Sequence, residues 1–290
     1  MPVHPGVPGS VAASPFLKWA GGKARLLPEL VRIYRATAPH GRYHEPFLGG
    51  GALFFGLVSE GLLVPGRAVL SDCNPHLIEA YRAVQDRPEA LIGLLEEHQA
   101  CHGTEHYALT RATVPDEAMA RAARLIYLNR TCFNGLYREN SGGGFNVPMG
   151  RYSNPRIADR ARIEAASRAL AAVTLSCRHF ADVEANVGAG DFVYFDPPYH
   201  PLSRTSSFTR YVGLDFGEEQ QVALRDLFAL LDRRGATVLL SNSDCPFIRD
   251  LYRDWPMRTV GMPRAINARS SGRGDVAELL VCNRRMFSPA

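Results

Sequence analysis

The chain has 290 residues, 46% hydrophobic and 21% charged, which suits a soluble globular protein with a sizeable core. No apolar run reaches the roughly 18 residues that cross a bilayer, and residues 1–13 lack the cationic and apolar segments of an export signal. The six cysteines are scattered without close pairs, which argues against a disulfide framework or a zinc cluster. We therefore expect a cytoplasmic protein without membrane segments.

The formal charge of +4 is compatible with a polyanionic partner but does not require one. Nearly all basic residues are arginines, and the only lysines are Lys18 and Lys23. Arginine-rich genome composition explains most of this bias. Both lysines fall within one eight-residue motif, however, which suggests a specific use for an ammonium group there.

Residues 1–13 are rich in Pro, Gly, Ser and Ala and are expected to form a loose tail. Short apolar runs bounded by turn residues predict six strands. These lie at residues 43–47, 69–72, 173–177, 192–195, 237–241 and 279–282. Apolar residues at helical spacing predict helices after residue 51, throughout 74–129, between 155 and 172, and over 218–233.

Strands that alternate with helices imply right-handed crossovers and a mostly parallel sheet. The predicted fold is therefore α/β, a doubly wound, mostly parallel sheet with an insertion. Residues 14–73 and 156–290 would form the main domain, and residues 74–155 the insertion. Within it, residues 131–152 are rich in Gly, Asn and aromatic residues and predict a loop or hairpin.

The segment Asp196-Pro197-Pro198-Tyr199 follows the apolar run of residues 192–195. Prolines fix φ and remove backbone donors, so the carbonyl groups of Asp196 and Pro197 are free to accept hydrogen bonds from an amine. Tyr199 adds a stacking surface. This combination indicates a pocket for a flat ring that carries an amino group, although an ordinary exit from a strand would also use a Pro-Pro turn.

A glycine loop, Phe47-x-Gly49-x-Gly51, lies between a predicted strand and a predicted helix. Glycines let the backbone approach a ligand there, and a tight turn is the alternative. Asp72, at the end of the next strand, occupies the position at which nucleotide-binding sheets place an acid on ribose hydroxyls. The two features suggest a cofactor that contains adenosine. The spacing is not G-x-G-x-x-G, so NAD is not inferred.

Upstream, the segment of residues 16–23 combines an aromatic residue, glycines and two cations before a predicted helix. An aromatic face and an ammonium group suit a zwitterionic ligand with a carboxylate. A phosphate-binding loop is the other interpretation, but the segment lacks the frame of G-x-x-x-x-G-K-[ST].

Several motifs in one order resemble the Dam-type DNA adenine-N6 methyltransferases of the D12 class. They are Phe16-Leu17-Lys18-Trp19-Ala20-Gly21-Gly22-Lys23, Glu45-Pro46-Phe47-Leu48-Gly49-Gly50-Gly51, Ser71-Asp72-Cys73-Asn74 and Asp196-Pro197-Pro198-Tyr199. Further matches are Leu128-Asn129-Arg130, Phe133-Asn134-Gly135-Leu136, Gly144-Phe145-Asn146-Val147-Pro148, Gly150-Arg151-Tyr152 and residues 275–280. The similarity spans about residues 14–287.

The resemblance implies a Rossmann-like catalytic domain that binds S-adenosyl-L-methionine and releases S-adenosyl-L-homocysteine. The implied cofactor contacts are Trp19, Lys23, Phe47, Gly49, Gly51, Asp72 and Asp196. Trp19 would pack on the cofactor, Lys23 would lie near its carboxylate, and Asp72 would bind the ribose. The implied catalytic residues are Asp196, Pro197 and Tyr199, which would hold an adenine flipped out of duplex DNA.

Residues 74–155 would then be the target-recognition domain. The implied DNA contacts are Arg130, Phe133, Asn134, Leu136, Arg138 and Pro148. An arginine at the position of Arg138 reads guanine in this family, since its planar fork donates to both acceptors of guanine in the major groove. Residues 129–168 also carry seven arginines against three acids, an excess that suits contacts with phosphates.

Thr131, Cys132 and Tyr137 depart from the family pattern, which leaves the recognition sequence open, with GATC as the candidate. A role in host DNA maintenance or in restriction-modification is equally open. Residues 203–215, with Phe208 and Tyr211, would form a loop that closes near target and cofactor, or only a long surface loop.

Two other functions are kept as alternatives. One is a catalytically silent DNA-binding protein that responds to S-adenosylmethionine, and the other is a methyltransferase that acts on RNA or on a protein amide. His98, His102 and His106 recur every four residues, but Gly103 and the absence of carboxylates in register argue against a metal site. No metal and no obligate protein partner are expected.

Overall fold

The computed structural model describes residues 11–19, 23, 25–140, 142–201, 210–211, 214–262 and 276–284. Of the predicted motif residues, Ala20, Gly21, Gly22 and Asp275 lie outside the described residues. So do Phe208 and the side chain of Tyr211.

The chain divides into two compact units. Unit 1 comprises Met1–Gly22, Gly49–Ala68 and Asn74–Leu175, and unit 2 comprises Lys23–Leu48, Val69–Cys73 and Ser176–Ala290. The predicted boundaries at residues 73 and 155 stay a prediction.

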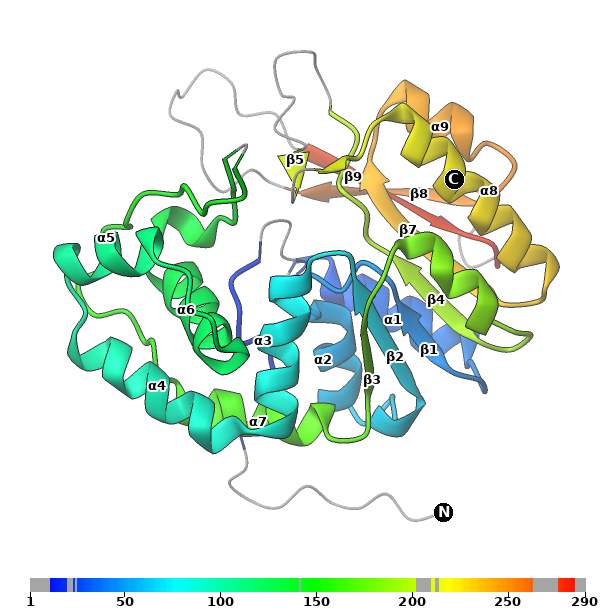
Figure 1. Ribbon diagram of the computed structural model, residues 1–290. Coiled ribbons are helices and arrows are strands. Elements are labelled where there is room, and N and C mark those ends of the chain that lie inside the picture. Colours follow the sequence, from blue (N-terminus) through cyan, green and yellow to red (C-terminus); the bar gives the residue numbers. More distant parts are fainter. Residues whose placement is uncertain are drawn as a thin grey trace. The chain divides into compact units, whose positions relative to one another are not determined.

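A seven-stranded sheet has the strand order β3-β2-β1-β4-β7-β9-β8 (Figure 1). Its strands are β1 (Tyr43–Glu45), β2 (Ala68–Asp72), β3 (Thr174–Cys177), β4 (Phe192–Phe195), β7 (Thr237–Ser243), β8 (Met257–Met262) and β9 (Val276–Cys282). β4 is parallel to both β1 and β7, whereas β9 is antiparallel to β7 and β8. The predicted doubly wound, mostly parallel sheet is confirmed.

The strand order reverses between β1 and β4, which is where open α/β sheets bind ligands at the carboxyl ends of their strands. All six predicted strands are present. The sequence did not predict β8 or the short pair β5 (Arg210–Tyr211) and β6 (Leu214–Asp215).

The helices are α1 (Leu27–Thr37), α2 (Ala52–Ser59), α3 (Pro75–Asp86), α4 (Pro88–Ala100), α5 (Thr104–Ala112), α6 (Ala118–Thr131), α7 (Arg160–Leu170), α8 (Glu218–Arg233) and α9 (Pro246–Leu251). The predicted helix over 218–233 coincides with α8. Within the described residues, none of these helices combines the length and apolar character that a membrane span requires.

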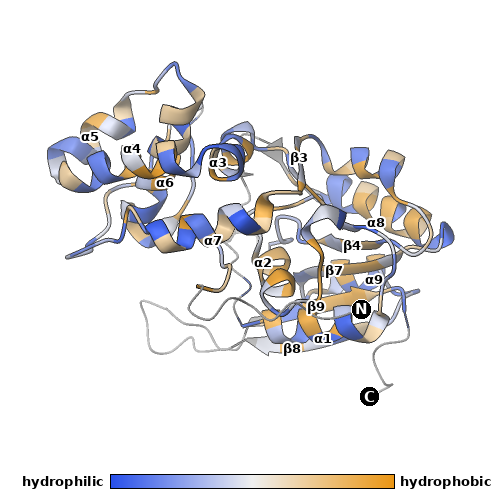
Figure 2. Cartoon of the chain, turned by 90° about the horizontal axis from the view of Figure 1, so that it is seen from below, coloured by the Kyte–Doolittle hydropathy of each residue, from blue (hydrophilic) through white to orange (hydrophobic). Residues whose placement is uncertain are grey.

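Unit 2 packs helices on both faces of its strands. Val193 and Phe195 of β4 belong to a buried cluster with Leu224 and Phe228 of α8. Figure 2 shows α8 with one hydrophobic and one hydrophilic side. On the opposite face, the ring of Phe192 meets Tyr34 of α1, with ring centroids 4.9 Å apart. This alternation is what a strand buried on both faces requires.

Unit 1 contains α3 to α7 and a hairpin over residues 131–150. The hairpin closes through antiparallel bridges between Cys132 and Met149 and between Glu139 and Phe145. Tyr107 of α5 supports it by donating a hydrogen bond from its hydroxyl to the carbonyl oxygen of Val147, at 2.9 Å. The Gly- and Asn-rich segment is thus a hairpin, one of the two forms predicted.

The three regularly spaced histidines form a cluster with Tyr127 of α6. His98 Nδ1 lies 2.9 Å from His106 Nε2, and His102 Nδ1 lies 3.1 Å from the Tyr127 hydroxyl. The rings of His98 and Tyr127 stack with centroids 4.6 Å apart. Burial, and secondarily the charge of His106, lower the pKa of His98 to about 4, so His98 is neutral in the folded protein at pH 7.

This lowered pKa predicts a loss of stability in acid. The unfolded chain binds a proton at His98 near pH 6.5, so stability should fall as the pH drops from there toward 4. Replacement by a group that does not titrate, His98→Asn, should reduce the loss between pH 7 and pH 5 by about 1 kcal/mol, allowing for partial exposure. Urea unfolding at both pH values measures this, and equal losses in the two proteins would contradict it.

Candidate active site

The carboxylate of Asp196, directly after β4, is the centre of a polar network in unit 2. Its Oδ1 lies 2.9 Å from Lys23 Nζ and accepts a hydrogen bond from Ser241 Oγ at 2.9 Å. The hydroxyls of Tyr194 and Ser241 are 2.9 Å apart and extend the network along β4 and β7. The side chain of Lys23 is 6% exposed and that of Asp196 is 21% exposed. The carboxylate therefore remains accessible from one side.

Burial raises the pKa of Asp196 above its ordinary value, and nearby Glu278 adds to the rise. The Lys23 ammonium and the Ser241 hydroxyl oppose it. A carboxylate with a raised pKa is a better proton acceptor than a fully solvated one. The network thus holds a basic oxygen in a fixed position at the carboxyl end of β4.

Tyr199 is fixed by its hydroxyl, which donates to Glu278 Oε2 at 2.7 Å. The Lys23 ammonium lies 4.5 Å from the centroid of its ring, within the range of a cation–π interaction. Burial raises the pKa of Tyr199 well above its usual range, so the hydroxyl stays protonated and donates. The ring thereby has one orientation beside Asp196.

The turn between Asp196 and Tyr199 is held from behind. The carbonyl oxygen of Pro198 accepts a hydrogen bond from Gln221 Nε2 at 3.1 Å. Gln221 Oε1 in turn accepts from Asn242 Nδ2 at 3.0 Å, and Asn242 Oδ1 accepts from the amide of His200 at 3.1 Å. Side chains of α8 and β7 therefore immobilise the turn.

Sequence reasoning missed Glu278, Ser241, Tyr194 and Gln221 as members of this site. A usable signal was present, because residues 241–243 place Ser, Asn and Ser in an otherwise apolar strand, and all three are buried. Buried polar groups need partners, so such a run at a strand end marks a polar site. Glu278 lies in the predicted match at residues 275–280 but was not singled out.

Two of the predicted cofactor contacts in unit 2 follow neighbouring strands. Phe47, after β1, stacks on Phe180 with centroids 5.3 Å apart and meets Phe216 edge to face at 5.6 Å. Asp72 ends β2 and is 4% exposed. The backbone amide of Leu48 donates to the carbonyl oxygen of Ser71 at 3.0 Å, which joins the exits of the two strands.

The remaining predicted cofactor contacts lie in unit 1. Gly49 and Gly51 have φ values of 47° and 65°, which favour glycine over other residues. A Cβ atom on Gly49 would lie 2.9 Å from Cδ1 of Trp19, so the indole packs directly on the glycine turn. Tyr81 of α3 donates from its hydroxyl to the carbonyl oxygen of Gly49 at 3.1 Å.

The predicted DNA contacts are distributed unevenly. Phe133 and Leu136 are 51% and 40% exposed, which is unusual for large apolar side chains on a hairpin. Asn134, Arg138 and Pro148 are also exposed. Arg130, by contrast, is 9% exposed, and burial lowers its pKa to about 10. Five of the six residues therefore lie on the surface of the hairpin, and Arg130 lies inside α6.

Arg138 is held along the hairpin by hydrogen bonds to Asn146. Its Nε donates to Asn146 Oδ1 at 2.6 Å, and its Nη2 donates to the carbonyl oxygen of Asn146 at 3.3 Å. Since a guanidinium has five donors, Nη1 and the second hydrogen of Nη2 are not used by these bonds.

Among the described residues, no group of three or more His, Cys, Asp or Glu side chains is arranged to bind a metal ion.

Residues 19–265 match the profile of the family described as D12 class N6 adenine-specific DNA methyltransferase. The chain belongs to this family. It is 44% identical over 277 residues to the Type II methyltransferase M1.LlaDCHI of Lactococcus lactis subsp. cremoris, covering 93% of this chain and 95% of that protein. It is 37% identical over 286 residues to the Type II methyltransferase M.MjaIII of Methanocaldococcus jannaschii, covering 93% and 98%. A DNA adenine methylase of Vibrio cholerae is 36% identical over 285 residues, covering 94% and 96%.

The predicted function is thereby confirmed as that of an adenine-specific DNA methyltransferase. Membership of the family implies DNA as substrate and S-adenosylmethionine as methyl donor. The individual cofactor, catalytic and DNA contacts stay predictions.

The hydrogen bond between Tyr199 and Glu278 predicts that substitutions at these two residues have non-additive effects on the free energy of unfolding. In a double-mutant cycle of Tyr199→Phe and Glu278→Gln, the coupling energy in unfolding should be about 1.5–3 kcal/mol, as for a hydrogen bond to a charged group. Turnover in DNA adenine methylation should fall in each single variant, and the double variant should lose little more. Glu219→Gln, a change at an exposed carboxylate of α8, is the matched control. Additive effects of the two substitutions would contradict a shared role.

Proposed function

We propose that the protein is a site-specific DNA methyltransferase (adenine-specific) that transfers a methyl group from S-adenosylmethionine to N6 of an adenine extruded from double-stranded DNA. The observation that supports this most is the fixed pair of Asp196 and Tyr199 at the carboxyl end of β4. A base inside a duplex cannot present its amino group to such a pair, so the target must leave the stack at a cost of a few kcal/mol.

The chain's own residues account for the activation of the adenine amine. The Asp196 carboxylate and the Pro197 carbonyl accept hydrogen bonds from N6 and draw its lone pair out of conjugation with the ring. Tyr199 stacks on the flipped base in the orientation fixed by Glu278. Asp196 also takes up the proton that N6 loses as the new C–N bond forms, a role to which its raised pKa is suited. Positioning and charge stabilisation supply the rest.

The residues present fit S-adenosylmethionine. Asp72 offers a buried carboxylate for the ribose hydroxyls, Phe47 an aromatic face, and Lys23 an ammonium for the methionyl carboxylate. For Trp19, Gly49 and Gly51 of unit 1, the assignment to the donor rests on the sequence resemblance. When bound, S-adenosylmethionine supplies a methyl group on a sulfonium ion, which is reactive toward a nitrogen nucleophile without a metal.

We assign sequence reading to the hairpin of unit 1. Its exposed Phe133 and Leu136 are suited to enter the stack that the adenine leaves. The free hydrogens of Arg138 at Nη1 and Nη2 form the planar fork that matches guanine O6 and N7. Asn134 and Pro148 are the other two exposed residues that we assign to DNA. Arg130 is 9% exposed at the end of α6, and its contact with DNA stays a prediction.

The central test is transfer itself. Purified protein is incubated with duplex DNA and S-adenosylmethionine, and the DNA is digested to nucleosides. N6-methyladenine is expected, and Asp196→Ala should lower its formation by about a hundredfold or more while duplex binding is retained. Asp250→Ala, at an exposed carboxylate of α9, is the control.

Other outcomes of this test favour the alternatives. Methyl label on RNA or on protein would identify a different substrate. DNA binding that responds to S-adenosylmethionine without any transfer would identify a silent regulator. Equal loss of duplex binding and transfer in Asp196→Ala would mean that Asp196 is structural.

Arg138 provides a test of base reading. Arg138→Ala should cost about 1–3 kcal/mol of discrimination at one base pair, and should relax preference at that position only. Competition between duplexes with single substitutions in the methylated site, GATC being the first candidate, measures this. Arg82→Ala removes an exposed arginine from α3 of the same unit and should leave discrimination unchanged. An unaltered preference in Arg138→Ala would refute the assignment.

A further inference from the structure

Tyr137 lies between two proposed DNA contacts but faces the other way. Leu136 and Arg138 are exposed, whereas Tyr137 is half-buried between them in the chain. Leu136 has an extended backbone, with φ −69° and ψ 145°. Successive side chains in extended backbone point to opposite sides. The hairpin therefore presents its two reading residues outward and directs Tyr137 into unit 1.

On that inner side, Tyr137 contacts a residue assigned to the cofactor. Its ring stacks on the indole of Trp19, with centroids 5.3 Å apart and an interplanar angle of 26°. The indole in turn packs on the glycine turn, since a Cβ atom on Gly49 would lie 2.9 Å from Cδ1 of Trp19. Trp19 thus has glycine backbone and the Tyr137 ring as neighbours.

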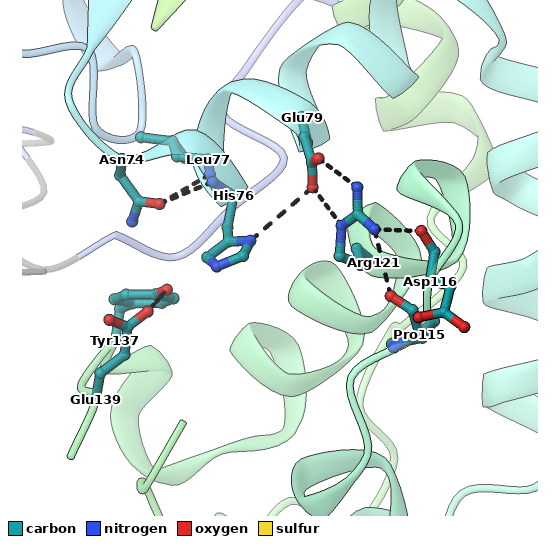
Figure 3. Close-up of polar contacts among 9 residues, drawn as sticks. All are labelled: Asn74, His76, Leu77, Glu79, Pro115, Asp116, Arg121, Tyr137 and Glu139. Carbon is teal, nitrogen blue, oxygen red and sulfur yellow. Dashed lines mark hydrogen bonds and ion pairs between the residues drawn. The ribbon is translucent and has the colours of Figure 1, made fainter. Parts of the chain in front are cut away.

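The hydroxyl end of Tyr137 is fixed as well. It donates to the carboxylate of Glu139, two residues further along the hairpin (Figure 3). Figure 3 also shows Asn74 near this end, where its side chain accepts hydrogen bonds from the backbone amides of His76 and Leu77 at the start of α3. Asn74 directly follows Asp72-Cys73, the segment assigned to the cofactor ribose. Burial, with Glu139 in addition, raises the pKa of Tyr137, so the hydroxyl stays a donor.

We propose that Tyr137 is a positioning residue that couples the reading of DNA to the binding of the methyl donor. A shift of the hairpin that lets Leu136 and Arg138 engage a base pair also moves Tyr137, which sits one residue away. Because the Tyr137 ring stacks on Trp19, the same shift changes the position of the indole that packs on the donor. This proposal rests on the proposed function, since it takes Trp19 as a donor contact and Arg138 as a base contact.

Such a link is a coupling free energy, and it is reciprocal. Cognate duplex should tighten the binding of the donor or its product, and the product should tighten the binding of cognate duplex by the same factor. The coupling factor in proteins is typically about 5- to 150-fold. One stacked aromatic pair accounts for a change of about 2- to 12-fold in a dissociation constant.

The first experiment measures this factor by titration calorimetry. The dissociation constant of S-adenosylhomocysteine is determined with and without a short duplex that contains the methylated site. Tyr137→Leu, which removes the stacked ring, should lower the ratio of the two constants by about 2- to 12-fold. Tyr137→Phe keeps the ring and should keep most of the ratio. Phe145→Leu is the matched control, because Phe145 packs edge to face on Tyr137 at 5.8 Å without being part of the Trp19 stack.

A second readout does not depend on the donor. The chain has two tryptophans, and the other, Trp255, donates from Nε1 to Asp232 in unit 2. In a Trp255→Phe background, the fluorescence of Trp19 should respond to cognate duplex, and Tyr137→Leu should abolish the response while duplex binding, followed by anisotropy, persists. Thermal unfolding identifies any variant that fails to fold.

The outcomes separate the two proposals. If the unchanged protein forms no N6-methyladenine and binds no S-adenosylhomocysteine, the proposed function fails and the coupling fails with it. If the unchanged protein is active but Tyr137→Leu shows the same ratio and the same fluorescence response, the coupling alone is overturned. A purely structural role would lower the unfolding temperature of Tyr137→Leu and Phe145→Leu alike and leave the ratio unchanged.

Discussion

The ion pair between Lys23 and Asp196 is the constraint on which the chemistry of unit 2 depends. Two oppositely charged groups at 2.9 Å are tolerated in a largely buried site only if further hydrogen bonds satisfy them. Ser241 supplies one such bond. The arrangement has a chemical consequence, since Lys23 stabilises the charge of a partly desolvated carboxylate whose side chain is still 21% exposed. A more exposed aspartate would be ionised without help, but it would be a weaker acceptor and less precisely placed.

Much of this could be read from the sequence because the signals were local. The apolar run of residues 192–195 ends in a carboxylate and two prolines, and this alone predicted the end of β4 and an acceptor site. The glycine turn was predicted for the same reason, since Gly49 and Gly51 adopt positive φ values. Such features depend on neighbouring residues. The parallel sheet then brings the ends of β1, β4 and β7 to one edge without further information.

What could not be predicted depends on pairing between distant segments. Glu278 becomes the partner of Tyr199 only because β9 runs antiparallel beside β7, where it pairs with Ser243. The sequence did not predict β8, whose Met257–Met262 run has no strict alternation, and the order of β9 and β8 at the sheet edge followed from neither composition nor period. The burial of Arg130 was not predicted for a related reason. An arginine next to a hairpin suggests phosphate binding, but every residue from Leu125 to Thr131 at the end of α6 is buried, and Arg130 is 9% exposed.

The position of Lys18 and Trp19 also depends on pairing with a distant segment. A single side chain, that of Asn129, makes this pairing. Asn129 is fully buried. Its Oδ1 accepts from the amide of Lys18 at 2.8 Å, and its Nδ2 donates to the carbonyl oxygens of Lys18 and Gly135 at 2.7 Å and 3.1 Å. An aspartate would lack the donor and a leucine would lack both functions, so that buried backbone groups would lose their partners at about 1–3 kcal/mol each. The Asn129 amide therefore joins the backbone at Lys18, 111 positions earlier in the sequence, to the backbone at Gly135 of the hairpin. Gly135 is required at this junction, since a Cβ atom there would lie 2.6 Å from Cβ of Lys18. Hydrogen bonds thus join the backbone that carries Trp19 to the backbone near Tyr137, independently of the ring stack. Because these bonds keep the two segments together, the proposed coupling between DNA reading and donor binding would involve movement of the Tyr137 and Trp19 rings.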